Sequence, residues 1–145
     1  MYILKALIIG LLGLAVLGAA AFFVLGLVSQ NGEAPGLVDG RLSPCPDSPN
    51  CVSSEEGTAP EKAVEPLAPE AWDKLPEVIA AQGGTVIETR DDYIAAEFKS
   101  DVFGFVDDVE FRRGEGQVHI RSASRVGHSD GGANAKRVAS LRKAL

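Results

Sequence analysis

The sequence has few of the residues on which most enzyme active sites depend. Its 145 residues include only two histidines and two cysteines. The histidines, His119 and His128, do not have the i, i+4 spacing of metal ligands on a helix. Neither a Gly-x-Ser-x-Gly turn nor a Gly-rich phosphate loop followed by lysine occurs. The sequence therefore predicts no catalytic residue, no metal site and no cofactor.

Length, composition and charge exclude further classes of protein. The chain is too short to hold separate cofactor and substrate domains. With 46% hydrophobic and 23% charged residues, it is neither collagen-like, nor a coiled coil, nor fully disordered. Acidic residues outnumber basic ones by 20 to 14, which argues against nucleic acid as a partner.

The beginning of the chain lacks charge almost completely. Lys5 is the only charged side chain in residues 1–28, and Ala6 to Val28 form an uninterrupted run of 23 apolar residues or glycines. As a helix this run would be about 34 Å long, enough to cross a hydrocarbon core of about 30 Å. The alternative is a cleaved secretory signal with small residues at Ala19–Ala21. An apolar signal segment is usually only about 7–15 residues long, so we expect residues 1–28 to be an uncleaved transmembrane anchor.

The single lysine predicts the orientation of this anchor. Positive residues stay preferentially on the cytoplasmic side of a membrane. Lys5 precedes the apolar run and no basic residue follows it closely. We therefore expect a cytoplasmic N-terminus in the cell (inner) membrane, with the rest of the chain periplasmic or extracellular.

Residues 29–69 are predicted to be a Pro-rich linker. They contain seven of the eight prolines, which disfavours a regular helix or a central strand. Cys45 and Cys51, the only cysteines, form a Cys-x5-Cys motif in this segment. In an oxidising compartment we expect them to form a disulfide. A zinc site is the alternative, but it would need two further ligands, and only the distant histidines could supply them.

Residues 70–145 are predicted to form a compact α+β domain. An apolar periodicity indicates a helix over Glu70–Gln82, with Pro76 as a second start, and another over Asn134–Leu145. Between them, four segments have the composition or alternation of strands, namely Thr85–Thr89, Tyr93–Lys99, Phe105–Arg112 and Val118–Ser124. The order predicts an antiparallel four-stranded sheet with helices on one face.

The strand alternation also predicts which side chains share a face. The face away from the helices would carry the polar side chains of Tyr93, Glu97, Asp108, Glu110, His119 and Arg121, and we expect it to be solvated. Asp107 has the inward parity of Val109 and Phe111. An inward carboxylate needs a partner, so either a bulge turns Asp107 outward or an arginine from the C-terminal segment pairs with it. We expect Asp107 or Asp108 to bond Arg121 or Arg125.

Charge is divided along the chain. Residues 29–111 hold 18 acidic and 5 basic side chains, whereas residues 112–145 hold 2 acidic and 8 basic ones. The basic segment enters the last helix through Ser129 or Asp130, either of which could cap it. Free backbone donors near arginines are typical of an anion site. We favour the other interpretation, in which Ser129 and Asp130 only cap the helix and the arginines pair with Asp107 and Asp108 for structure. The candidate binding residues are Asp107, Asp108, Arg121, Ser124, Arg125, Ser129, Asp130, Asn134 and Arg137.

Three motifs in order along the chain carry a resemblance to a known family. They are Pro-Cys-Pro-Asp-Ser-Pro-Asn-Cys-Val-Ser-Ser, Phe-Val-Asp-Asp-Val-Glu-Phe and His-Ile-Arg-Ser-Ala-Ser-Arg-Val-Gly-His-Ser-Asp-Gly-Gly-Ala-Asn. From about Leu42 to Leu145 the chain resembles the family called domain of unknown function 1499. The resemblance implies an envelope or organelle-membrane setting and supplies no reaction. It also suggests that the polar motif residues assemble in one cluster.

These observations favour a binding protein over an enzyme. We expect a membrane-tethered, extracytoplasmic binding or scaffolding domain whose partner is an envelope protein, an anionic small molecule or a lipid. The alternative is a small envelope hydrolase or transferase that acts on a lipid or glycan with the same polar cluster. His128, Ser129 and Asp130 are consecutive, so their side chains diverge and cannot form a triad among themselves.

Overall fold

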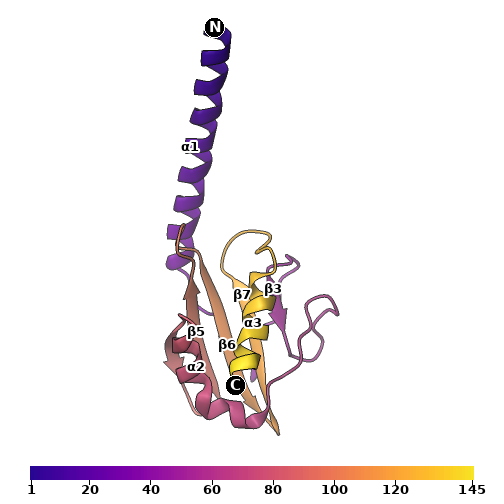
Figure 1. The fold of residues 1–145 in the computed structure, drawn as a ribbon. Helices are drawn as coiled ribbons and strands as arrows, with labels where there is room; N and C mark the ends of the chain where they lie inside the picture. The colour runs from indigo at the N-terminus through magenta and orange to yellow at the C-terminus, as the bar shows by residue number, and fades with distance from the viewer.

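The computed structural model describes all 145 residues and begins with one long helix. This helix, α1 (Tyr2–Gln30), projects away from the remainder of the chain (Figure 1). It is apolar and long enough to cross a membrane. Only Gly26 and Ser29, in its last two turns, are buried. The predicted N-terminal helix is therefore present, and its C-terminal end is in contact with the folded part.

The folded part is built on one five-stranded antiparallel sheet. Its strands, in spatial order, are β3 (Cys51–Ser53), β7 (Gln117–Ser124), β6 (Val106–Gly114), β5 (Tyr93–Lys99) and β4 (Thr85–Thr89). The four predicted strands are present within two residues of their predicted ends. The prediction of four strands was wrong, because β3 adds a fifth at the edge of the sheet beside β7. A strand of three residues between prolines has too little alternation to be detected.

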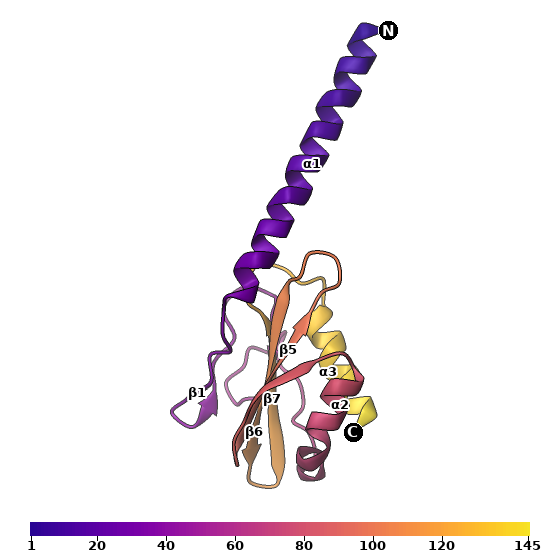
Figure 2. The ribbon, with the colours of Figure 1, turned by 90° about the vertical axis from the view of Figure 1, so that its left-hand side faces the viewer.

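Two helical segments cover one face of this sheet. A 3-10 helix, η1 (Pro69–Lys74), leads into α2 (Leu75–Ala81), and α3 (Ala133–Ala144) packs beside it (Figure 2). Pro76 lies in the first turn of α2, where its missing N–H is not needed. The core between helices and sheet contains Trp72, Leu75, Ile79, Ile94, Val109, Phe111, Ile120, Val138 and Leu141. Burying such a side chain contributes roughly 1.5–3 kcal/mol, so this layer is the main source of apolar stabilisation.

The opposite face of the sheet is covered as well, so the prediction that it is solvated was wrong. Tyr93 and Glu110 are 0% exposed and Arg121 is 6% exposed. The cover comes from the segment predicted to be a linker, which runs back along the sheet after α1. Its two short strands, β1 (Leu37–Val38) and β2 (Arg41–Leu42), form a hairpin on the side away from α2 and α3 (Figure 2).

The disulfide between Cys45 and Cys51 is present, which confirms the predicted pairing. The Cα atoms of the two cysteines are 5.6 Å apart, and both sulfurs are used in the bond. Zinc coordination by two free thiolates is incompatible with this arrangement. Because Cys51 is the first residue of β3, the bond ties the preceding loop to the edge strand of the sheet.

Removal of this disulfide should destabilise the domain moderately. The chain-entropy model gives about 2 kcal/mol for so short a loop. We expect the Cys45→Ser/Cys51→Ser double variant of the full chain to lose about that much free energy of unfolding in a urea titration. In the wild type, neither cysteine should react with an alkylating agent before reduction. Quantitative labelling of both thiols in freshly prepared membranes would contradict the assignment.

Candidate functional site

Strands β6 and β7 divide the candidate residues between two faces of the sheet. Side chains alternate along a strand, and Asp107 and Ser124 point toward α3, whereas Asp108 and Arg121 point toward the β1–β2 side, as their partners show. The expectation of one assembled cluster was therefore wrong. The motif residues form separate groups on opposite sides of the sheet.

On the β1–β2 side, the guanidinium of Arg125 connects two strands to α1. Its Nε donates to Oδ2 of Asp108 at 2.8 Å, and its Nη2 bonds Oδ1 of Asp108 at 2.6 Å and pairs with Glu97. Its Nη1 donates to the backbone oxygen of Ser29 at 3.1 Å. We call these four residues the Arg125 cluster. The Asp108–Arg125 contact is one of the pairings predicted from the sequence.

The Arg125 cluster is enclosed. The side chains of Arg125 and Asp108 are 6% and 4% exposed. The hydrogen bond with Asp108, followed by the contact with Glu97, raises the pKa of Arg125 despite its burial. A guanidinium already held by two carboxylates and a carbonyl has no strong site left for an external anion.

A second buried carboxylate, Glu110, lies next to this cluster on the same face. Its Oε1 accepts hydrogen bonds from the Tyr93 hydroxyl at 2.7 Å and from the Gly36 N–H at 2.8 Å, and its Oε2 accepts one from Arg121 at 2.9 Å. Burial raises the pKa of Glu110, although Tyr93 and Arg121 act in the opposite direction. Burial and the bond to Glu110 raise the pKa of Tyr93. Glu110 thereby holds the segment after α1 against the sheet.

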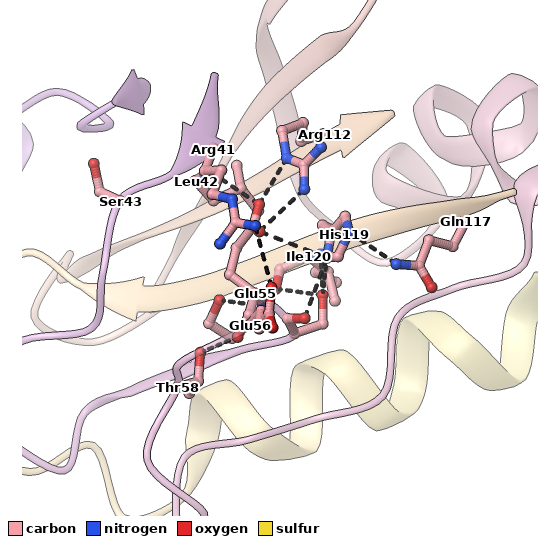
Figure 3. Close-up of polar contacts among 12 residues, drawn as sticks. Arg41, Leu42, Ser43, Glu55, Glu56, Thr58, Arg112, Gln117, His119 and Ile120 are labelled. Atoms are coloured by element: carbon pink, nitrogen blue, oxygen red, sulfur yellow. Dashed lines mark hydrogen bonds and ion pairs between the residues drawn. The ribbon is translucent and has the colours of Figure 1, made fainter. Parts of the chain in front are cut away.

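The third buried carboxylate of this face is Glu55, which follows β3 (Figure 3). Its oxygens accept hydrogen bonds from Arg112 at 2.7 and 3.0 Å, and one also accepts from the Leu42 N–H at 3.0 Å. Burial alone would raise the pKa of Glu55, but these donors outweigh it and leave the pKa below its ordinary value. Glu55 is therefore an ionised bridge between β2 and β6.

A histidine next to Glu55 resembles a catalytic arrangement but lacks the required geometry (Figure 3). The Nδ1 of His119 lies 3.4 Å from the Ser54 hydroxyl and 3.8 Å from Glu55. In a hydrolase triad the serine and the carboxylate bond opposite nitrogens of the imidazole; here both approach Nδ1. The Ser54 oxygen also accepts the Ile120 N–H at 2.8 Å. This group connects the segment after β3 to β7.

On the helix side of the sheet, Asn134 at the start of α3 is the centre of the other group. It is 0% exposed. Its Oδ1 accepts from Ser122 at 2.6 Å and from Arg137 at 2.7 Å, and its Nδ2 lies within 2.8–3.1 Å of acceptors on Asp130, Ser124 and Asn50. We call Asn134, Asp130, Ser122, Ser124, Arg137 and Asp107 the Asn134 cluster. It joins α3 to β7 and to the residue before β3.

Asp107 pairs with an arginine of the C-terminal segment, which was one of the two predicted alternatives; the other was a bulge that turns its side chain outward. The register between β6 and β7 is continuous at Asp107, so no bulge turns the side chain outward. Its Oδ2 accepts a hydrogen bond from Nη2 of Arg137 at 2.8 Å. The partner is on α3 and not at Arg121 or Arg125, because the parity of Asp107 directs it to the helix side.

The N-terminus of α3 is occupied by a carboxylate of the chain itself. Asp130 accepts the N–H groups of Gly132 at 2.9 Å and Asn134 at 2.8 Å. Burial would raise the pKa of Asp130, but these hydrogen bonds outweigh it and leave the pKa lowered. Ser129 is exposed and accepts only the Gly131 N–H, at 3.3 Å. Of the two predicted caps, Asp130 is therefore the one whose side chain accepts a backbone N–H of the first turn of α3.

Sequence reasoning missed two residues of the polar contacts on the β1–β2 side. Glu55 lies in the segment predicted as linker, and its only local signal is its position directly after the Cys-Val-Ser-Ser motif. Ser29 is marked only as the first polar residue after the apolar run. Both act through contacts with residues more than fifty positions away, which no local pattern reveals.

The Asp108–Arg125 pair should contribute strongly to stability. Removing one partner of a buried pair typically costs about 3–5 kcal/mol, whereas an exposed pair contributes roughly 0–1 kcal/mol. We expect Arg125→Ala to lower the free energy of unfolding by an amount in the first range. Arg41→Ala, which breaks the exposed pair with Glu56, is the matched control and should have little effect. A double-mutant cycle with Asp108→Ala should show strong coupling; additive losses would contradict the pairing.

Comparison with known proteins identifies the family and nothing closer. A family model described as "Protein of unknown function (DUF1499)" matches residues 41–145, which include all three motifs. No curated protein and no solved structure matches the chain. The match confirms the resemblance seen in the motifs. The chain therefore belongs to the DUF1499 family.

Proposed function

We propose that the chain is a single-pass membrane protein that presents a binding domain on the periplasmic or extracellular side of the cell membrane. α1 contains the complete uncharged run from Ala6 to Val28. Lys5 before this run favours a cytoplasmic N-terminus. The disulfide supports a periplasmic or extracellular location of the domain, because disulfides persist mainly in oxidising compartments.

The observation that carries this proposal is the attachment of α1 to the domain. Ser29 is 1% exposed, and its hydroxyl accepts the Val106 N–H at 3.0 Å while its carbonyl accepts Arg125. The side chain of Gln30 contacts both Gly104 and Lys99. A flexible linker between α1 and the domain would make no such contacts. The helix therefore supports the domain at a fixed place, directly at the membrane surface.

The geometry favours binding over catalysis for this domain. The one serine–histidine–carboxylate group, at His119, has the wrong arrangement for a nucleophile. Arg125 and Arg137 are each held by carboxylates, which supports the favoured structural role of the arginines over an anion site. The edge strand β4 and the loops remain exposed to a partner, and the loops at the α1 end of the sheet are those closest to the proposed anchor (Figure 1).

A pair of C-terminal fusions tests the orientation. In a bacterial host, a fusion to alkaline phosphatase should be active, because that enzyme needs export to form its disulfides. A fusion to a fluorescent protein that cannot mature after export should be dark. The intact mass of the membrane-extracted chain should include residues 1–30, since we expect no cleavage. A bright and phosphatase-inactive pair, or a mass lacking the apolar run, would overturn the proposal.

A further inference from the structure

A cavity of about 310 Å³ lies where α1 meets the folded part. Phe22 and Leu25 of α1 and Phe105 form an apolar wall. The other wall comes from β6, the end of β7, the loop after it and the first turn of α3. It combines the apolar residues Val126 and Ala133 with the polar side chains of Asp107, Ser124, Ser129 and Asp130. The cavity is therefore amphipathic and spans the junction between the anchor and the domain.

The apolar wall of this cavity lies at the depth of the bilayer surface if α1 spans the membrane. Phe22 precedes Val28, the end of the apolar run, by six residues, or about 9 Å along the helix. The loop between β5 and β6 accompanies α1 over this distance: Phe103 packs on Phe22 and Phe23 with ring centroids 5.3 and 5.1 Å apart. Val102 at the tip of that loop is 68% exposed. Apolar groups that penetrate about 5–10 Å are typical of the boundary between headgroups and acyl chains.

The polar wall has a distinctive charge. It contains two carboxylates, Asp107 and Asp130, and no lysine or arginine lines the cavity. Arg137 occupies only Oδ2 of Asp107, which leaves Oδ1 without a partner in the chain. The hydroxyls of Ser124 and Ser129 each accept one hydrogen bond and retain their own proton to donate. Both oxygens of Asp130 already accept hydrogen bonds from Gly132 and Asn134. The wall therefore offers one carboxylate oxygen, Oδ1 of Asp107, to an ammonium group, and two hydroxyls that can donate to phosphate or ester oxygens, but no cation to a headgroup whose only charge is its phosphate.

We propose that this cavity holds one bilayer phospholipid with a primary-amine, zwitterionic headgroup, of the phosphatidylethanolamine kind. The acyl chains would lie along Phe22 and Leu25, the amine would donate to Oδ1 of Asp107, and the serine hydroxyls would donate to the phosphate. Phospholipids are the molecules that a cavity at this depth meets at the highest concentration. This inference rests on the proposed membrane anchoring and adds the class of ligand.

Native mass spectrometry of the full chain tests the site. The chain is released from detergent micelles that contain equal amounts of phosphatidylethanolamine, phosphatidylglycerol and phosphatidylcholine with the same acyl chains. We expect one phosphatidylethanolamine to be retained per chain. Ala133→Leu fills the cavity from the first residue of α3 and should reduce retention by about tenfold, equivalent to about 1.4 kcal/mol. Ala139→Leu, exposed on the same helix, is the matched control and should retain the lipid.

A charge substitution keeps the proposal testable if Ala133→Leu fails to fold. Ser129 is exposed, and Ser129→Lys adds a cation to the polar wall; it should shift retention from phosphatidylethanolamine toward phosphatidylglycerol. Ser140→Lys, at an exposed position of α3 away from the cavity, should not. Equal retention in all variants, a wild-type preference for phosphatidylglycerol, or equal competition by soluble glycerophosphoethanolamine would overturn the lipid site. The fusions above address the anchoring separately, so an anchored chain without lipid would refute only this inference.

Discussion

The arrangement of α1 on the sheet depends on the hydrogen bonds and ion pairs of the Arg125 guanidinium. It lies directly after β7, pairs with Asp108 on β6 and Glu97 on β5, and donates to the last turn of α1. A buried cation of this kind is costly unless its partners are all in place. The sheet supplies both carboxylate partners of Arg125, and α1 adds the acceptor for its Nη1. In this way one side chain makes the orientation of the domain relative to α1 part of the folded state.

Alternation along the strands allowed much of the sheet to be predicted. The segments between residues 85 and 124 have one apolar face that matches the helices, and strand parity located Asp107 on the inner side, where it needs a partner. The Asp108–Arg125 pair also followed from these patterns, because consecutive antiparallel strands bring their charged residues close together. Local propensity and strand parity were sufficient to predict these strands and this pair, because the interactions join elements that are neighbours in the sheet.

The cover of the polar face could not be predicted in the same way. Tyr93, Glu110 and Arg121 alternate as solvent-facing residues do, yet they are buried beneath the segment after α1. That segment has little regular structure, and its position is set by two carboxylates, Glu110 and Glu55, which accept its backbone N–H groups and arginine donors of the sheet. The same parity that placed each side chain correctly also divided the motif residues between two faces. Shared polarity in a motif was therefore no guide to a shared site.

The central claim is that the apolar N-terminal helix and the domain form one unit. Gly26 tests it most directly, because a Cβ atom there would lie 1.8 Å from the backbone oxygen of Phe103, whereas one at Gly18 would meet nothing within 4 Å. The melting temperatures of Gly26→Leu and Gly18→Leu are measured on the full chain in the same detergent. Their comparison separates the loss of the contact between α1 and the domain from the effect of a leucine elsewhere in α1. We expect Gly26→Leu to lower the melting temperature of the domain and Gly18→Leu to leave it unchanged. Equal melting temperatures for both variants and the wild type would show that α1 is only a loose tether.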